Sequence, residues 1–361
     1  MPARDRLYIG CDQQQYTINW EKRHDKRNVA LLAIASCDNI SGYCFGIHVN
    51  LDDRFSYQEI RELSKAAGDD SKPQPYREYA NYWFAEDYYE QARRKGYTLN
   101  SDSETESELS EIFSTTRLPY RGMQIHNEYT MNGHMCVLKK MFQNVEKVRF
   151  TLDNDTGLRG ACLAVFADRI IDRTCDVFTI SVNNKFTVDE REIINRKTRK
   201  LLNSVKKKLN LHSDRAAMSF LISKIFAVVN TRELLASDKV IKFPFAHKGE
   251  LQKNVVFESN LGDYDLDHVA NLFLTASIHR TNNFFQQVRR RINLLDRSLN
   301  TVGERVWSGY NPYNPEIIQK MLNILRVYYN FCLKGTDKKT PAEKLELAKG
   351  PVALEKIMYC V

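Results

Sequence analysis

The alternation of hydrophobic and polar positions predicts β-strands in the first fifty residues. Apolar runs cover 7–11, 16–20, 29–37 and 43–49, and the last two flank a polar turn at 38–42. Turn residues between two such runs favour an antiparallel hairpin. We therefore expect the chain to begin with a meander of strands.

The middle of the chain predicts a strand, a helix and a second strand in succession. Residues 148–152 form an apolar run that ends at Asp153, 158–171 carry apolar residues at helical spacing, and 177–182 are again strand-like. This order implies a parallel crossover. Asp153 would then lie at the carboxyl end of its strand, where α/β folds place their chemistry.

Helical periodicity and polar segments fill the rest of the chain. We expect helices at 57–67, 76–95, 131–144, 187–210, 268–295 and 315–333. The fourth begins at a capping box, Thr187-Val188-Asp189-Glu190, and becomes strongly basic in its second half. The segment 101–111 is rich in acids, serines and threonines, which predicts a solvated loop.

Composition narrows the class of protein. The 361 residues are 43% hydrophobic, which is enough for a sizeable core, and the net charge of +8 suits a polyanionic partner without demanding one. The eight cysteines form no Cys-x-x-Cys pair, so we expect reduced thiols. No apolar stretch approaches 18 residues, and no signal peptide precedes the first strand. We expect a cytoplasmic protein without a membrane role.

Acids at strand ends carry the candidate chemistry. Asp12 follows the run 7–11 and Asp153 follows 148–152, so both are expected at the rim of one sheet. A single aspartate at such a place is usually a turn former or helix cap, and Asp155 could serve as the cap or as the ligand in place of Asp153. Two acids together with a basic late helix favour a Mg²⁺ site.

Four segments, taken in order, carry a resemblance to a known family. They are 9–12 with the hairpin to Gly46, the strand and helix around Asp153, the arginine-rich stretch 282–297, and the tail from Tyr329 through 340–351. In this order they resemble bacterial insertion-sequence transposases of the DDE or DDD class. The resemblance implies an α/β fold with a ribonuclease-H-like mixed sheet flanked by helices. It also implies three parts: the first part of the core in 1–186, a basic, mainly helical insert in 187–267, and C-terminal helices that complete the core in 268–361.

The implied function is Mg²⁺-dependent DNA cleavage and strand transfer during transposition. By resemblance, Asp12 and Asp153 would hold two Mg²⁺ ions, or Mn²⁺ in their place, together with the residue at the third acidic position. That residue is Asn282. An amide brings an oxygen but no negative charge, so we expect weaker metal binding and slower cleavage.

Three explanations fit Asn282. The first is a displaced register, with Asp296 or Glu258 as the acid, although Asp296 lies 14 residues further along, about 20 Å on a helix. The second is an Asp→Asn change introduced to trap a complex. The third is a naturally inactive transposase that keeps DNA binding. The alternative functions are accordingly an inactive DNA-binding protein, acting as regulator or assembly subunit, and a structure-specific nuclease.

The resemblance also implies partners. We expect double-stranded DNA at the element ends and the target, a homodimer or larger assembly on DNA, and a location at the bacterial nucleoid. Because the first catalytic strand begins within ten residues of Met1, end recognition is expected in the insert, in the C-terminal helices or on another polypeptide. The candidate DNA contacts are Lys197, Arg199, Lys200, Lys206, Lys207, Arg289, Arg290 and Arg291. The three consecutive arginines cannot all face DNA, since neighbours on a helix are about 100° apart.

Overall fold

A seven-stranded mixed sheet runs through the protein. The computed structural model describes residues 2–19, 27–84, 86–87, 117–183, 186–228, 240–247, 249–260, 264–296, 299–300, 306–307 and 311–359. The strands lie in the order β3-β2-β1-β6-β7-β9-β8. Their bounds are β1 Arg4–Ile18, β2 Val29–Asp38, β3 Cys44–Val49, β6 Val145–Asp153, β7 Cys175–Asn183, β8 Ile241–Lys242 and β9 Gln252–Phe257. Short two-stranded pairs join β4 (Leu51–Asp52) to β5 (Met123–Gln124) and β10 (Leu299–Asn300) to β11 (Val306–Trp307).

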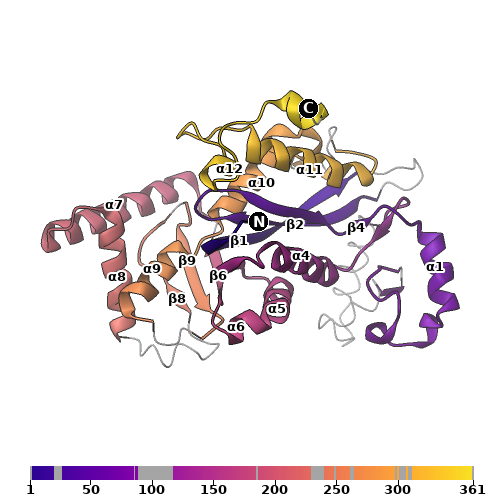
Figure 1. Ribbon diagram of the computed structural model, residues 1–361, viewed down its shortest axis with the longest axis horizontal. Helices are drawn as coiled ribbons and strands as arrows, with labels where there is room; N and C mark the ends of the chain where they lie inside the picture. The colour runs from indigo at the N-terminus through magenta and orange to yellow at the C-terminus, as the bar shows by residue number, and fades with distance from the viewer. Residues whose placement is uncertain are drawn as a thin grey trace.

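Helices cover both faces of this sheet (Figure 1). One face carries α10 and α11, and the opposite face carries α4 and α5. The helices are α1 Tyr57–Ala66, α4 Asn127–Met141, α5 Thr156–Val165, α6 Ala167–Ile171, α7 Val188–Leu209, α8 Asp214–Val228, α9 Leu266–Thr275, α10 His279–Arg291, α11 Glu316–Phe331, α12 Pro341–Lys344 and α13 Leu354–Tyr359. The expected α/β class, a mixed sheet flanked by helices, is confirmed.

The expected meander and crossover are present. Strands β1, β2 and β3 are antiparallel neighbours, while β6 and β7 run parallel to β1. The turn between β2 and β3 is fixed locally, because the Asp38 carboxylate accepts from the backbone N–H of Ser41 at 2.6 Å and Gly42 adopts a left-handed φ of +81°. Helix α5 makes the crossover from β6 to β7.

The first strand differs from the expectation. The runs 7–11 and 16–20 were predicted as separate strands, but β1 is continuous over Arg4–Ile18, so Asp12 lies inside a strand and not at its end. The polar stretch between the runs stays extended because β2 pairs with it throughout, Asp12 opposite Ala35 and Gln15 opposite Leu32. Strand β6 does end at Asp153, as predicted.

Two of the expected helices are also corrected. The helix predicted over 268–295 is two helices, α9 and α10, separated by residues 276–278. The helix predicted over 76–95 is absent over 77–84, where the buried Asp69 carboxylate accepts from the backbone N–H groups of Glu78 and Tyr79. Most of its remainder and the acidic segment 101–111 lie outside the described residues. Tertiary hydrogen bonds override helical periodicity at both places.

The insert contributes strands as well as helices. Strands β8 and β9 extend the core sheet beyond β7 and pack with α8 and α9 around Phe273. Helix α7 begins at the predicted capping box, with Thr187 and Glu190 each bonded to the other's backbone N–H. Of its 22 residues only Leu202 is buried. Within the described residues no helix is long and apolar enough to cross a membrane.

Candidate metal centre

Two aspartates from distant parts of the chain lie next to each other in the sheet. Strand β6 pairs in parallel with β1 up to Cys11 opposite Leu152. Asp12 and Asp153 each follow one residue later, so they are the next neighbours across the two strands. Neighbouring strands are about 4.8 Å apart, which brings both carboxyl groups within reach of one small ligand.

Both aspartates project toward the α10 face. Side chains alternate along a strand, and Ile9 and Cys11 belong to the core under α4 and α5, whereas Tyr16 packs with α10. Asp12 therefore points to the α10 side. In β6, Leu152 belongs to the α4 core, so Asp153 also points to the α10 side.

Burial disfavours the charged forms of both aspartates, and the Arg289 charge offsets part of this effect at Asp12. Burial and, to a smaller extent, repulsion from Asp153 together raise the pKa of Asp12 to about 7, against the opposing effect of a hydrogen bond from the Gln13 backbone N–H and of the Arg289 guanidinium. Burial also raises the pKa of Asp153. A bound cation would stabilise the charged forms of these two half-buried carboxylates.

Asp155 has a separate structural role. Its side chain accepts from the backbone N–H of Leu158 at 2.8 Å and caps α5. It still lies close enough to raise the pKa of both Asp12 and Asp153. The helix cap expected as one alternative for this residue is therefore present.

Helix α10 crosses the strand that carries Asp12. The Thr281 hydroxyl donates to the Gly10 carbonyl at 2.7 Å, and further along the helix Arg289 exerts its charge on Asp12 and Tyr16. Asn282 is half-buried beside Thr281. Seven residues separate it from Arg289, which is about two helical turns, so both project from the same side of α10 about 10 Å apart. An amide and a guanidinium therefore occupy this side of the helix.

The two other acids considered for the third position are placed elsewhere. Glu258 accepts from the Thr179 hydroxyl at 2.6 Å and pairs with Arg159 of α5 at 2.9 Å. Thr179 lies two residues after Val177 of the α4 core and therefore on the same face, so Glu258 is on the opposite face from Asp12. Asp296 follows a short 3-10 turn after α10 has ended at Arg291.

The donors at this centre fit a hard divalent cation. Carboxylate oxygens are the ligands Mg²⁺ prefers, and a bound cation would remove the repulsion that raises the pKa of Asp12. Among the described residues no cluster of three or more His, Cys, Asp or Glu side chains could hold a metal ion. Any such ion would therefore rest on Asp12 and Asp153, with Asn282 of α10 as the third ligand expected from the resemblance.

The predicted DNA contacts fall into two groups. Lys197, Arg199, Lys200 and Lys207 are exposed on α7, and Lys206 pairs with Asp214 of α8 at 2.5 Å. On α10, Arg290 and Arg291 are exposed, Arg291 bonding to Gln287 at 2.9 Å, whereas Arg289 is half-buried toward Asp12. The three arginines thus face different surroundings, as their spacing predicts.

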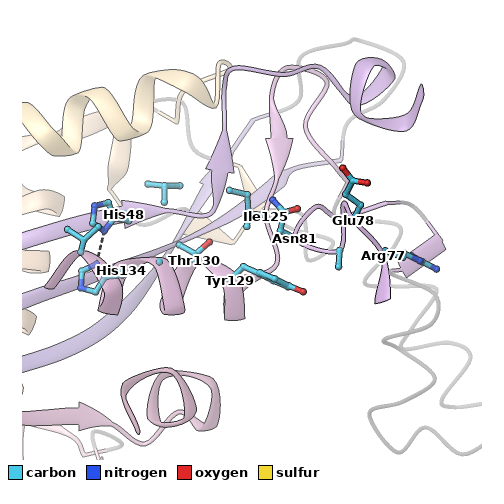
Figure 2. Close-up of a pocket in the computed structure, with 12 residues that line it drawn as sticks. His48, Arg77, Glu78, Asn81, Ile125, Tyr129, Thr130 and His134 are labelled. Atoms are coloured by element: carbon cyan, nitrogen blue, oxygen red, sulfur yellow. Dashed lines mark hydrogen bonds between the residues drawn. The ribbon is translucent and has the colours of Figure 1, made fainter. Parts of the chain in front are cut away.

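A pocket on the α4 face contains a histidine pair that sequence reasoning missed. This cavity of about 650 Å³ is lined by His48 of β3, His134 of α4 and nearby residues that include Tyr129 and Asn81. The two imidazoles share a hydrogen bond of 2.7 Å between their Nδ1 atoms (Figure 2). Burial lowers the pKa of each, so both rings are neutral at pH 7. The two residues are 86 positions apart, and no spacing rule connects them.

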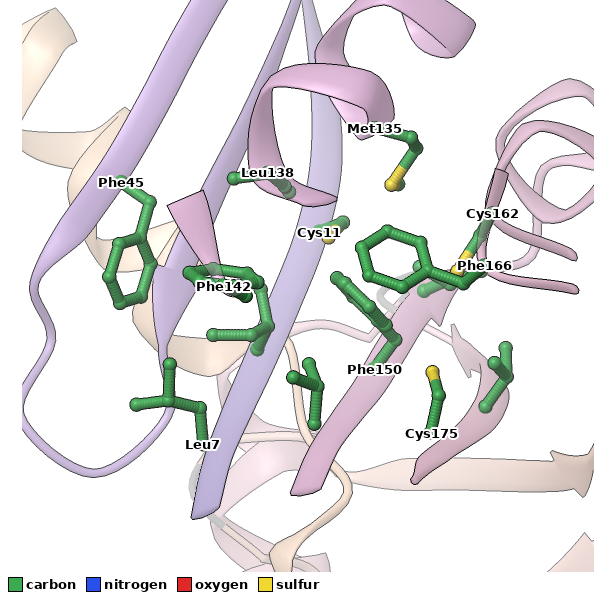
Figure 3. Packing of buried hydrophobic residues seen from close by; sticks show 14 of the residues in the cluster. Leu7, Cys11, Phe45, Met135, Leu138, Phe142, Phe150, Cys162, Phe166 and Cys175 are labelled. Carbon is green, nitrogen blue, oxygen red and sulfur yellow. The ribbon is translucent and has the colours of Figure 1, made fainter. Parts of the chain in front are cut away.

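The histidine pair continues as a buried polar chain toward the strand of Asp12. The His134 Nε2 atom lies 2.6 Å from the Ser36 hydroxyl, which lies 3.0 Å from the Cys11 thiol. Figure 3 shows Cys11 enclosed by Met135, Phe150 and other apolar side chains of this core. Burial raises the pKa of the Cys11 thiol to about 12, so the chain ends in an unreactive neutral group. Two members of this network, His48 and His134, line the pocket.

Comparison with known proteins does not place the chain in a family. No known protein family, curated protein or solved structure matches it.

Proposed function

We propose that this protein is a DNA transposase that cleaves and joins phosphodiester bonds with divalent metal ions held by Asp12 and Asp153. The observation that carries the proposal is the adjacency of these two half-buried carboxylates on parallel strands. The mixed sheet with helices on both faces supports a ribonuclease-H-like core, the architecture that the resemblance implies. The whole proposal rests on this site together with that resemblance.

The charge of each side chain sets its proposed role at the site. Asp12 and Asp153 would bind the metal ions and orient them at the carboxyl end of β6. When bound, such ions activate the attacking oxygen and stabilise the leaving oxygen in phosphoryl transfer. Asn282 supplies no negative charge, so this chain would hold its ions more weakly than a three-carboxylate site and would cleave more slowly.

Helix α7 supports DNA as the partner. Its exposed basic side chains extend along a helix that buries only one of its 22 residues. A cationic helix of this kind binds phosphates through charge, without reading sequence. The arginines at the end of α10 offer a second cationic surface close to the carboxylates.

A second candidate is a transposase-derived DNA-binding protein without cleavage activity, a regulator or assembly subunit. The charge of Arg289 favours it, because the guanidinium lowers the pKa of Asp12 and partly neutralises the site that a metal ion would occupy. In this case α7 would still bind DNA, and the carboxylates would remain without a catalytic role.

Nicking of supercoiled plasmid in Mg²⁺ or Mn²⁺ separates the candidates. We expect slow nicking by the unaltered chain and loss of it in Asp12→Asn and Asp153→Asn, with Asp168→Asn as the matched control because Asp168 is an exposed partner of Lys139. Nicking that survives both core variants would overturn the assignment of the carboxylates. Absence of nicking with intact DNA binding would favour the second candidate. Cleavage without joining to a second duplex would indicate a nuclease of the same fold.

A further inference from the structure

Two buried charges of the insert hold the segment that leads into α10. Glu250 is 4% exposed, and its Oε1 atom accepts from the Ser277 hydroxyl at 2.6 Å and from the Ile278 backbone N–H at 3.1 Å. The Lys253 ammonium lies 2.8 Å from Glu250 Oε2 and donates to the Ala276 carbonyl at 2.7 Å. Each of the three residues between α9 and α10 is thus bound by one of these charged side chains.

The same segment seats α10 on the strand of Asp12. The Ser277 hydroxyl accepts from the His279 backbone N–H at 3.1 Å at the beginning of the helix. One turn later Thr281 donates to the Gly10 carbonyl at 2.7 Å. At Gly10 a Cβ atom would lie 3.1 Å from the Ser277 carbonyl and 2.8 Å from Asn39 Oδ1, so helix and strand are in close contact there. A shift of 276–278 would therefore move α10 relative to Asp12.

The charges of Glu250 and Lys253 depend on each other. Lys253 is 1% exposed and its ammonium lies 4.3 Å from the centre of the Phe243 ring. A buried charge that loses its partner is strongly unfavourable, whereas replacing both charges by neutral groups is often tolerated. Replacing either Glu250 or Lys253 alone should therefore be more disruptive than replacing both together.

We propose that Glu250 and Lys253 are positioning residues that set α10 over Asp12 and Asp153 and so couple the insert to the metal centre. The part that concerns the metal centre rests on the proposed function. The coupling has three steps. Glu250 and Lys253 bind residues 276–278, and these residues lead directly into α10. Helix α10 in turn contacts Gly10, two residues before Asp12.

The test compares Glu250→Gln, Lys253→Met and the double variant with Val269→Ala, a buried position of α9 that removes core packing and leaves the ion pair in place. Three quantities are measured: amide hydrogen exchange at Asn282, whose N–H donates to the Ile278 carbonyl at 2.9 Å, affinity for Mn²⁺ alone, and the thermal midpoint. We expect at least tenfold faster exchange and fivefold weaker Mn²⁺ binding in each single variant. In the double variant, exchange at Asn282 and Mn²⁺ affinity should both return part of the way to the unaltered values. Val269→Ala should lower the midpoint similarly while leaving exchange at Asn282 and Mn²⁺ affinity near the unaltered values.

The positioning role would be overturned if Val269→Ala accelerated exchange at Asn282 as much as Glu250→Gln or Lys253→Met. It would also be overturned if these two single variants exchanged at the rate of the unaltered chain. Hydrogen exchange does not depend on catalysis. Fast exchange in the single variants of a chain that neither binds Mn²⁺ nor nicks DNA would therefore uphold the coupling of the insert to α10 and reject the proposed function.

Discussion

Asp12 and Asp153 stand side by side on parallel strands β1 and β6, each one residue beyond the paired Cys11 and Leu152. Asp12 belongs to the middle of its strand and Asp153 to the end of its own. The shorter strand thus stops where the longer one continues, and both carboxyl groups face α10 at the carboxyl end of β6. The predictions below concern this pair and the helix above it.

Asp12→Asn should stabilise the metal-free protein at high pH. The pKa of Asp12 is about 7 in the folded chain, above its usual value of 3.8, so the folded state binds more protons than the unfolded state between these values. Stability from this group is present below pH 4 and is lost as the pH rises through 7. We expect Asp12→Asn to gain on the order of 1–2 kcal/mol at pH 8 and little at pH 4. Urea unfolding at both pH values checks this, and an equal gain at pH 4 would contradict it.

Asn282→Asp should strengthen metal binding. A carboxylate at this position would add negative charge on the side of α10 that also carries Arg289, two turns away. We expect Mn²⁺ to bind at least tenfold more tightly by calorimetry, and plasmid nicking to accelerate. Asn283→Asp, one position further along the helix, is the matched control. Nicking by the unaltered chain as fast as by Asn282→Asp would show that the third acid lies elsewhere.

Arg289→Gln should raise the pKa of Asp12 further. The Arg289 guanidinium lowers this pKa, so its removal leaves burial and the repulsion from Asp153 less opposed. Carboxyl carbon NMR across the range pH 5–9 measures the shift. Arg290→Gln serves as control, because Arg290 is exposed and does not contribute to the pKa of Asp12. The same midpoint in both variants would remove Arg289 from the site.

Gly10→Ala should destabilise the fold and disturb the centre together. The added Cβ would meet Asn39 Oδ1, the Thr281 hydroxyl and the Ser277 carbonyl at 2.8–3.1 Å. We expect a loss of about 1–3 kcal/mol in urea unfolding and weaker Mn²⁺ binding. Gly160→Ala is the opposite case, since it lies within α5 with open space around it and should stabilise by about 0.5–1 kcal/mol. Full stability of Gly10→Ala would contradict the close contact between α10 and β1 at Gly10.

Neutralising α7 should weaken DNA binding in a salt-dependent way. Replacing Lys197, Arg199 and Lys200 by alanine removes up to three phosphate contacts. The plot of the logarithm of the DNA-binding constant against the logarithm of salt concentration should therefore become less steep, by up to about 3 in slope. Fluorescence anisotropy with a random duplex at several salt concentrations measures the slope. A control with Lys65, Lys140 and Lys320 replaced carries the same change in net charge from other exposed sites. Identical slopes in the two variants would exclude α7 as the contact surface.

Local signals in the sequence were sufficient for several elements. The turn at Asp38 and Gly42, the capping box at Thr187 and Glu190, and the end of the strand at Asp153 each depend on bonds between residues a few positions apart. The mixed α/β class followed from the order of such elements. The resemblance to transposases placed Asp12 and Asp153 together as an expectation, and their adjacency in the sheet agrees with it.

Tertiary structure decided what the local pattern could not. Asp12 lies within a strand because β2 pairs along the polar stretch that seemed to end it. Residues 276–278 leave the helical path because Glu250 and Lys253 bind their backbone and side chains. The orientation of Arg289 toward Asp12 required α10 to be seated on β1.

The sequence by itself therefore determined many of the elements and the identity of the candidate acids, because helix caps, turns and apolar periodicity act over a few residues. Only the tertiary structure decided that Asp12 and Asp153 are neighbours and that a buried ion pair connects the insert to α10. These relationships depend on strand register and on hydrogen bonds between distant segments, which hydrophobic periodicity does not encode.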